Sequence, residues 1–317
     1  METSTASFTN QYPSTALPMF QSWCDAKQIQ ESTFMKSSNV VNAMINLTLS
    51  LVTITGNVLI LLSLRRSSRL HATSKALYCS LAISDLGVGL VVQPAFFIRL
   101  VAGPSIPETC EILGVIINVA GVISVGISLQ ILSAISVDRV LAIRLKMRYK
   151  EVASVFRVRL VLITCWFFST FHAFSIFFSP AFFSLFQILG IILCIGVSTV
   201  SYIIIFHTLR KLQSQVQNYS LEEEASQNSF NIKRYKKSVS TSLWVYASLL
   251  ACYMPFMLSL IARIAWGMSP TFLAIQWCTV SMIYMNSALN PILYCWKIPE
   301  VRDLMKGIIK ECCCCRK

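Results

Sequence analysis

The sequence predicts an all-α membrane protein, in which seven transmembrane helices form a bundle and a short amphipathic cytoplasmic helix follows. Of the 317 residues, 55% are hydrophobic and only 13% are charged, about half the charged share of a soluble domain. The charges gather in short clusters, with long uncharged runs between them. This pattern indicates a bilayer as the solvent, because a soluble surface needs charges spread along the chain.

The uncharged runs give the seven helices in order. A helix needs about 20 residues to cross about 30 Å of hydrocarbon. The run Leu160–Leu209 is too long for one crossing, so Ser179-Pro180 is predicted as the turn between spans four and five. The other spans are predicted at Val40–Leu64, Ala76–Ile98, Ile112–Val137, Ser238–Ala262 and Ile264–Trp296.

The placement of Lys and Arg orients this bundle. With the N-terminus outside, all but four of the 27 Lys and Arg residues fall on the cytoplasmic side. The four exceptions are Lys27, Lys36, Arg99 and Arg263. Residues 1–39 are then an extracellular tail, 40–297 the transmembrane domain, and 298–317 the cytoplasmic helix and Cys-rich tail. We expect a multi-pass plasma membrane protein with no nucleic-acid partner, since the basic clusters flank spans rather than form a soluble basic face.

The C-terminal segment predicts contact with membrane lipids. Residues 300–309 place apolar side chains on one helical face and Lys or Arg elsewhere, as in a helix lying on the inner leaflet. The cysteines that follow are Cys312, Cys313, Cys314 and Cys315. Cysteines after such a helix are candidates for S-palmitoylation. A metal-binding tetracysteine is the alternative, disfavoured because four consecutive residues cannot easily surround one ion.

One carboxylate, Asp85, is predicted at mid-membrane depth. An ionisable residue there is a functional hypothesis by default. Polar residues on other spans that can face it are Asn57, Ser124, Ser128, Asn286, Ser287 and Asn290. Oxygen ligands around one carboxylate suit a small hard cation. The other interpretation is a protonated Asp that is hydrogen-bonded within the bundle.

Seven short motifs, one in each span, resemble those of the rhodopsin-like (class A) G-protein-coupled receptors. They are Gly56-Asn57, Leu81–Leu86, Asp138-Arg139-Val140, Trp166, Tyr202, Cys252–Pro255 and Asn290–Tyr294. The resemblance covers residues 40–310. It implies a receptor rather than an enzyme, with an outer half that binds an extracellular ligand and an inner half that activates a heterotrimeric G protein. It also implies an allosteric sodium ion, and no other cofactor, held by Asp85, Ser128, Asn286 and Asn290.

The same motifs suggest how activation proceeds. Arg139 is expected to pair with Asp138 until the G protein competes for it. Pro255 lacks a backbone donor and is expected to kink span six into a hinge. Tyr202 and Tyr294 are expected to bridge through water in the active state.

Departures from the family pattern indicate which subgroup of these receptors the sequence resembles. Val140 and Tyr253 replace the usual Tyr and Trp, and no Cys lies between spans four and five to form the usual disulfide. Cys110 has Cys24 as its only evident outer partner, and both a disulfide and two free thiols remain open. In these features the sequence is similar to the branch that holds the melanocortin, lysophospholipid, cannabinoid and adenosine receptors. Residues 142–149 are similar to the second inner loop of the adenosine type.

The residues that bind the known ligands of related receptors are not found at the matching positions of this sequence. Gly121 stands where amine receptors have Asp, and Leu260 where adenosine receptors have a purine-binding Asn. The outer cavity is predicted to be lined by Gly121, Ser124, Tyr253, Met257 and Leu260, with Arg99 and Arg263 at its mouth. An apolar wall with two cations favours a lipid or small apolar acid, unless both arginines snorkel into solvent. The alternatives are a peptide-activated or constitutively active receptor of the same fold and, less favoured, a transporter, since no internal repeat is visible.

Overall fold

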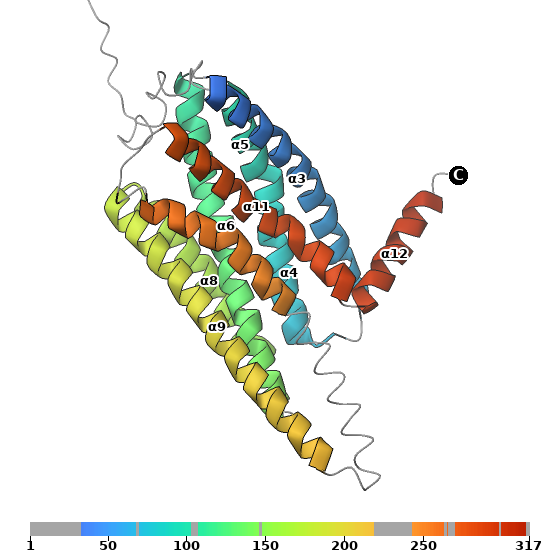
Figure 1. The fold of residues 1–317 in the computed structure, drawn as a ribbon. Helices are drawn as coiled ribbons and strands as arrows, with labels where there is room; N and C mark the ends of the chain where they lie inside the picture. The colour runs from blue at the N-terminus through green and yellow to red at the C-terminus, as the bar shows by residue number, and fades with distance from the viewer. Residues whose placement is uncertain are drawn as a thin grey trace, which may run out of the picture.

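A computed structural model describes residues 33–67, 70–102, 107–145, 148–218, 243–262, 265, 270–297 and 299–314. Within these residues the regular structure is helical, and seven helices are long and apolar enough to cross a membrane. The helices run side by side in one bundle, and the last helix leaves it at one end (Figure 1). We call that end the inner end and the opposite one the outer end.

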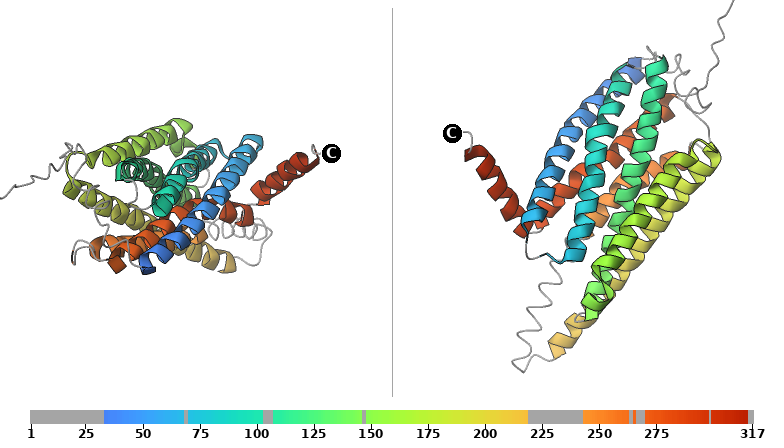
Figure 2. Two further views of the ribbon diagram at one scale, coloured as in Figure 1. Left: turned by 90° about the horizontal axis from the view of Figure 1, so that it is seen from above. Right: turned by 180° about the vertical axis from the view of Figure 1, so that it is seen from behind.

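The spans follow the predicted order. In chain order they are α3 (Thr33–Arg66), α4 (Ala72–Gly87) continued by η1 (Val88–Val92) and α5 (Gln93–Ala102), α6 (Pro107–Leu145), α8 (Val155–Ser175), α9 (Pro180–Asn218), the sixth span (Leu243–Ala262) and α11 (Pro270–Lys297). The short helix α7 (Tyr149–Val152) connects α6 to α8, and α12 (Pro299–Cys314) follows α11. Seen from above, α12 lies outside the bundle, beyond α3 (Figure 2).

All seven predicted spans are confirmed, including the turn between spans four and five. Helix α8 ends at Ser175 and α9 begins at Pro180, and the Phe182 N–H donates to Ser179 Oγ (3.3 Å). Several helices extend a turn or more beyond the uncharged runs. At the start of α8, for example, Ser154 accepts a hydrogen bond from the Arg157 N–H, which satisfies one of the free donors of the first turn.

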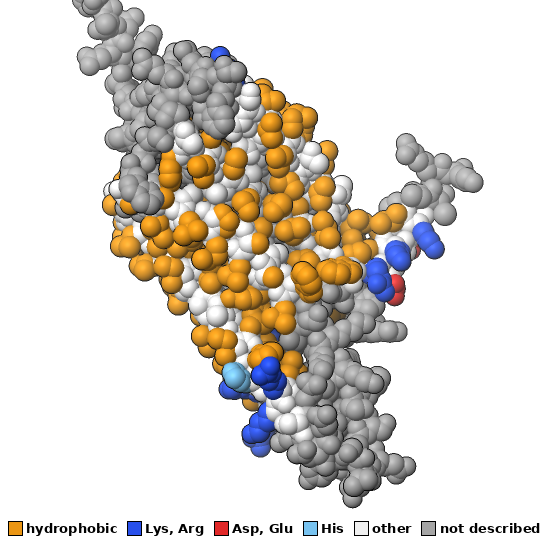
Figure 3. All heavy atoms as spheres, in the orientation of Figure 1, with side chains coloured by type: hydrophobic (Ala, Val, Ile, Leu, Met, Phe, Trp, Pro, Cys, Tyr) orange, Lys and Arg blue, Asp and Glu red, His pale blue; other side chains and the backbone are white. Residues whose placement is uncertain are grey.

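The outer surface of the bundle suits a lipid environment. Large apolar side chains are exposed on several spans, with Phe178 89% and Leu193 67% exposed. In the space-filling view, hydrophobic side chains cover most of the visible face, while Lys and Arg gather mainly at the inner end and on α12 (Figure 3). Such a surface would be a liability in water but is favourable against acyl chains.

Helix α12 confirms the predicted amphipathic tail helix. Val301, Met305 and Ile308 are buried, and they share one helical face because they lie four or three residues apart. Arg66 at the end of α3 pairs with Glu311 of α12 at 2.8 Å. Apolar packing therefore anchors α12 beside the inner end, with an exposed ion pair that adds little.

Two prolines explain close contacts of α3 with its neighbours. Pro94, the second residue of α5, has no N–H to donate back to η1, and the Gly89 carbonyl of η1 accepts from Ser50 Oγ (2.8 Å). Pro291 likewise leaves the Ser287 carbonyl without its usual donor, and Asn57 Nδ2 donates to it (3.1 Å). Polar side chains on α3 therefore satisfy backbone groups that proline leaves free in spans two and seven.

Candidate functional site

Asp85 lies at the centre of a buried polar cluster built by three spans. Ser128 Oγ of α6 donates to Asp85 Oδ1, and Asn290 Nδ2 of α11 donates to Oδ2, each at 2.9 Å. The Ser84 and Ser128 hydroxyls are also 2.9 Å apart. The Asp85 side chain is 0% exposed. Spans two, three and seven therefore converge on a single carboxylate in the interior of the bundle.

Several polar atoms of this cluster have no protein partner. Asn286 is buried, and neither its Oδ1 nor its Nδ2 has a hydrogen-bond partner in the described part of the chain. The Oδ1 atom of Asn290 is likewise without a partner. Buried polar atoms are normally satisfied by protein, water or an ion. Amide, hydroxyl and carboxylate oxygens around one negative charge form a donor set that fits a small hard cation.

The inner end of α6 presents a charged pair. Arg139 Nη2 lies 3.6 Å from Asp138 Oδ2, and the same nitrogen is 3.3 Å from both Ser74 Oγ and Tyr78 OH of α4. Asp138 Oδ1 accepts a 2.6 Å hydrogen bond from Tyr149 OH of α7. The guanidinium is therefore directed toward span two by several weak contacts rather than by one close ion pair.

Tyr149 links the short helix α7 to the pair formed by Asp138 and Arg139. Its hydroxyl lies 3.3 Å from Thr73 Oγ1, in addition to its hydrogen bond with Asp138. Burial raises the pKa of the Tyr149 hydroxyl, and the neighbouring Asp138 carboxylate raises this pKa further. The phenol therefore remains protonated and keeps donating to Asp138 at physiological pH.

Tyr202 and Tyr294 line one small cavity above Arg139. Its volume is about 10 Å³, and Tyr78, Tyr246 and Leu249 also line it. The rings of Tyr78 and Tyr294 meet edge to face at 5.0 Å, and those of Tyr202 and Tyr246 lie 4.8 Å apart. A space of about this size holds one water molecule at most. The two predicted tyrosines thus share a cavity, and their water bridge stays a prediction.

The outer cavity has a volume of about 110 Å³ and lies among spans two, three, five, six and seven. Its wall is mostly apolar but includes Arg99, whose side chain is 7% exposed. The other lining residues are Phe96, Ile117, Asn118, Gly121, Val122, Val125, Phe183, Gln187, Phe256, Leu260, Gln276, Trp277, Val280, Ile283 and Tyr284. Arg99 is therefore buried in the wall, which differs from the alternative in which it snorkels into solvent.

The predicted ligand-binding residues separate into four groups. Arg99, Gly121 and Leu260 line the outer cavity, and Tyr253 lines a second cavity that adjoins it. Ser124 and Met257 line neither cavity. A Cβ added to Gly87 would lie 2.6 Å from Ser124 Oγ, which places this serine against span two, and Met257 is 6% exposed in the core. Arg263 lies outside the described residues.

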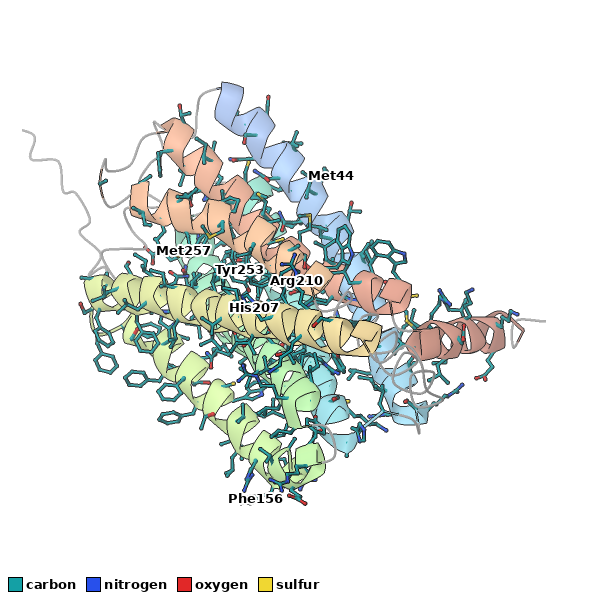
Figure 4. The ribbon with its side chains drawn as sticks, turned by 60° about the horizontal axis from the view of Figure 1, so that its bottom comes forward. Met44, Phe156, His207, Arg210, Tyr253 and Met257 are labelled. Carbon is teal, nitrogen blue, oxygen red and sulfur yellow. The ribbon has the colours of Figure 1, made fainter. Side chains whose placement is uncertain are left out.

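The second cavity is the larger of the two, with a volume of about 330 Å³. It lies between α6, α8, α9 and the sixth span. Its lining residues are Val122, Val125, Gly126, Leu129, Gln130, Phe168, His172, Phe186, Gln187, Gly190, Ile191, Leu193, Cys194, Tyr253, Phe256 and Ile283. Figure 4 shows Tyr253 and Met257 on the sixth span, next to α9 in that view. The sequence motifs gave no indication of this cavity, because most of its lining residues belong to no motif.

Polar residues on α3 were also missed, apart from Asn57. Buried residues at helical spacing along this span are Asn39, Asn42, Asn46, Ser50, Thr53 and Asn57. Asn46 Nδ2 donates to Ser281 Oγ of α11 (2.8 Å). The signal was present in the sequence as a polar residue every three or four positions along this span.

The predicted cysteine sites involve Cys110, in the first turn of α6, and the C-terminal tail. Cys110 is disulfide-bonded, whereas Cys79, Cys165, Cys194, Cys252, Cys278 and Cys295 are free. The predicted partner, Cys24, is outside the described residues, so this pairing stays a prediction. Of the four tail cysteines, the first three close helix α12, and Cys315 is outside the described part of the chain.

The sequence matches one family model and is similar to two known receptors over most of its length. The family model described as "7 transmembrane receptor (rhodopsin family)" matches residues 56–182 and 178–294. The adenosine receptor A3 of Bos taurus is 25% identical over 312 residues, an alignment that covers 90% of this chain and 94% of that receptor. The adenosine receptor A3 of Ovis aries shows the same identity and coverage.

Proposed function

Because the chain belongs to the rhodopsin family of seven-transmembrane receptors, we propose that it binds an extracellular ligand in its outer cavity and activates a heterotrimeric G protein at its inner end. Members of this family are receptors and not enzymes. The proposal places the N-terminus outside the plasma membrane and α12 on the cytoplasmic side. The concentration of Lys and Arg on the predicted inner segments supports this orientation.

The ligand we propose is a lipid or a small apolar acid. The observation that supports it is Arg99, a guanidinium that is 7% exposed in the wall of a mostly apolar cavity. Burial of apolar surface supplies most of the binding free energy in such a site. A carboxylate or phosphate is the group that a buried guanidinium binds best, because it accepts two parallel N–H donors.

A nucleoside is the second candidate. The two relatives described above are named adenosine receptors, and Asn118, Gln187 and Gln276 supply amides to the outer cavity. Gln276 Oε1 is buried without a partner among the described residues, so it can accept from an exocyclic amine. Against this candidate, Leu260 occupies the place at which the resemblance to adenosine receptors predicts a purine-binding Asn.

One experiment separates these candidates. The purified receptor in lipid nanodiscs is combined with heterotrimeric G proteins, and nucleotide exchange is measured with long-chain fatty acids, lysophospholipids, adenosine and a peptide panel. Stimulation by an acidic lipid, with lower potency for Arg99→Gln, supports the proposal. Stimulation by adenosine or a peptide alone would replace the lipid proposal. High exchange without any ligand would indicate a constitutively active receptor.

For the inner end we propose that Arg139 contacts the G protein once it leaves Asp138. Its Nη2 lies at 3.3 to 3.6 Å from three partners, so each contact is weak and can be exchanged for a carbonyl or hydroxyl of a partner protein. The sixth span runs through Pro255 as a helix. A swing of the inner half of the sixth span away from Tyr202 and Tyr294 would open the inner end of the bundle.

We also propose a sodium ion at the Asp85 cluster. Asp85, Ser128, Asn286 and Asn290 would hold it, and the unpartnered oxygens of the two asparagines support this assignment. When bound, the ion would supply a positive charge that draws spans two, three and seven together. Sodium would therefore favour the inactive arrangement and, by linkage, lower agonist affinity.

Palmitoylation of Cys312, Cys313, Cys314 and Cys315 is the last part of the proposal. The first three of these residues close an amphipathic helix whose buried face carries Val301, Met305 and Ile308, and Cys315 follows them in the sequence. Each acyl chain would add about 0.8 kcal/mol per buried CH₂ group. Metabolic labelling with a palmitate analogue tests it: replacement of all four by Ser should abolish the label, and unchanged labelling would place the acyl group elsewhere.

A further inference from the structure

The second cavity extends to the outside of the bundle. Phe168 of α8 and Leu193 of α9 line it, and their side chains are 51% and 67% exposed. Both residues lie within predicted membrane spans, so the exposed parts of their side chains face acyl chains. The cavity wall therefore includes side chains that a molecule dissolved in the bilayer can reach.

Gly190 leaves the gap between α8 and α9 unfilled. It lines the cavity, and a Cβ added to it would meet no atom within 4 Å. Most residues at this position would extend a side chain into that space. The absence of a side chain thus preserves both the volume of the cavity and its access from the α8–α9 side.

The cavity interior is apolar with a few hydrogen-bonding groups. None of its lining residues within the described chain is Lys, Arg, Asp or Glu. Gln130 Nε2 donates to Ser169 Oγ (2.9 Å), and His172 Nε2 lies 3.2 Å from the Phe183 carbonyl. Gln187 adds a further amide to the wall. A charged ligand would lose its hydration without gaining a counter-ion, whereas a hydroxyl could bond to these amides.

We propose that this cavity is a second binding site, entered from the bilayer between α8 and α9, for an uncharged lipid-soluble molecule that carries one hydroxyl group. A long-chain alcohol or a sterol has this chemistry. The volume of about 330 Å³ is within the usual range of ligand pockets. The proposal does not depend on the ligand of the outer cavity, whose defining charge is Arg99.

The position of the site predicts that its occupant modulates signalling. Tyr253 lines it from the sixth span, two residues before Pro255, and its hydroxyl donates to the Val125 carbonyl (3.4 Å). The residues that line both cavities are Val122, Val125, Gln187, Phe256 and Ile283. Because these walls are shared, an occupant changes the affinity of the outer cavity for its ligand, and the outer ligand changes the affinity for the occupant equally.

Photolabelling in the bilayer tests the site. The full-length receptor in nanodiscs is irradiated with a long-chain alcohol that carries a diazirine in its chain, and labelled peptides are identified by mass spectrometry. The corresponding diazirine fatty acid is the charged comparison. We expect the alcohol to label α6, α8 and α9 next to the cavity, an excess of unlabelled alcohol to remove this label, and the acid to label these positions at least tenfold less.

Two glycines of α9 provide matched variants. Gly190→Phe fills the cavity and should reduce the competed label at least tenfold. Gly196→Phe adds the same ring to an exposed position where a Cβ also meets nothing within 4 Å, and it should leave the label unchanged. Gly190→Leu serves if the larger ring lowers the yield of folded receptor. The proposal is overturned if the label cannot be competed, spreads over the whole lipid-facing surface, or persists in both Gly190 variants.

Discussion

Around Asp85, polar side chains from spans two, three and seven meet at 2.9 Å and exclude solvent, whereas around Arg99 the walls leave a cavity of about 110 Å³. The first region is constrained by hydrogen bonding inside a bilayer, where each unpaired polar group is costly. The second region is constrained mainly by the shape and charge of whatever binds. Few side-chain choices therefore satisfy the first region, and many satisfy the second.

This difference explains which functional features short motifs can reveal. Asp85, Ser128 and Asn290 belong to the residues that the sequence analysis selected, and the structure brings them into direct contact. In the outer cavity, Gln187, Gln276 and Tyr284 belong to no motif and were missed. We expect the inner groups to act as shared machinery for signalling and the outer ones as ligand-specific contacts.

The largest effect is expected at Arg139. Arg139→Ala should abolish ligand-stimulated nucleotide exchange while leaving ligand binding and surface expression intact, because no other described cation lies beside Asp138 at the inner mouth. Arg210→Ala is the control, since Arg210 is an exposed cation near the inner end of α9 (Figure 4). Its guanidinium lies over the Phe206 ring, 4.4 Å from the ring centroid. Normal exchange by the Arg139 variant would show that this residue is not part of the coupling machinery.

At Arg99 the effect should be intermediate and confined to ligand binding. Arg99→Gln should raise the concentration of acidic lipid needed for half-maximal exchange about 10- to 100-fold, as expected for loss of a charge-assisted hydrogen bond worth about 1.5–3 kcal/mol. Arg99→Lys keeps the charge but not the bidentate geometry, so a smaller loss is expected. Equal potencies for all three receptors would remove the acid from the proposed ligand class.

Substitutions of two glycines allow the packing of the two regions to be compared through the free energy of unfolding. A Cβ on Gly56 would lie 2.9 Å from ring carbons of Pro291, and one on Gly121 would make ordinary contacts at 3.5 Å or more. Gly56→Ala should therefore lower the free energy of unfolding by about 1–3 kcal/mol, whereas Gly121→Ala should leave it nearly unchanged. Thermal unfolding of both variants in nanodiscs measures this, and equal melting temperatures would refute the tight α3–α11 contact.

Much of the bundle could be predicted from the sequence for a physical reason. Uncharged runs of sufficient length must span the hydrocarbon as helices, and Pro180 had to break the longest run. The ends of the helices could not be predicted in this way, because residues such as Arg139 and Arg144 in α6 remain helical beyond the uncharged region. Capping residues such as Ser154 carried the missing signal for α8.

The cavities were harder to predict, since a cavity depends on what several helices leave unfilled. The apolar character of Leu260 and the small size of Gly121 indicated part of the outer wall. The burial of Arg99 depends on the rotation of span two, where the π-helical segment η1 changes the register before α5 begins. A regular helical period does not include that change, so the sequence left open whether Arg99 faces the cavity or the solvent.

The most direct test of a cation site at the Asp85 cluster of the inactive bundle is a melting-temperature measurement. The ligand-free receptor is unfolded in sodium chloride and in potassium chloride at equal ionic strength. Sodium at ten times its Kd should stabilise the wild type by about 1.4 kcal/mol, which corresponds to a rise of a few degrees. Asp85→Asn should melt at the same temperature in both salts. An equal melting temperature for the wild type in both salts, or a sodium effect that survives in Asp85→Asn, would contradict the account.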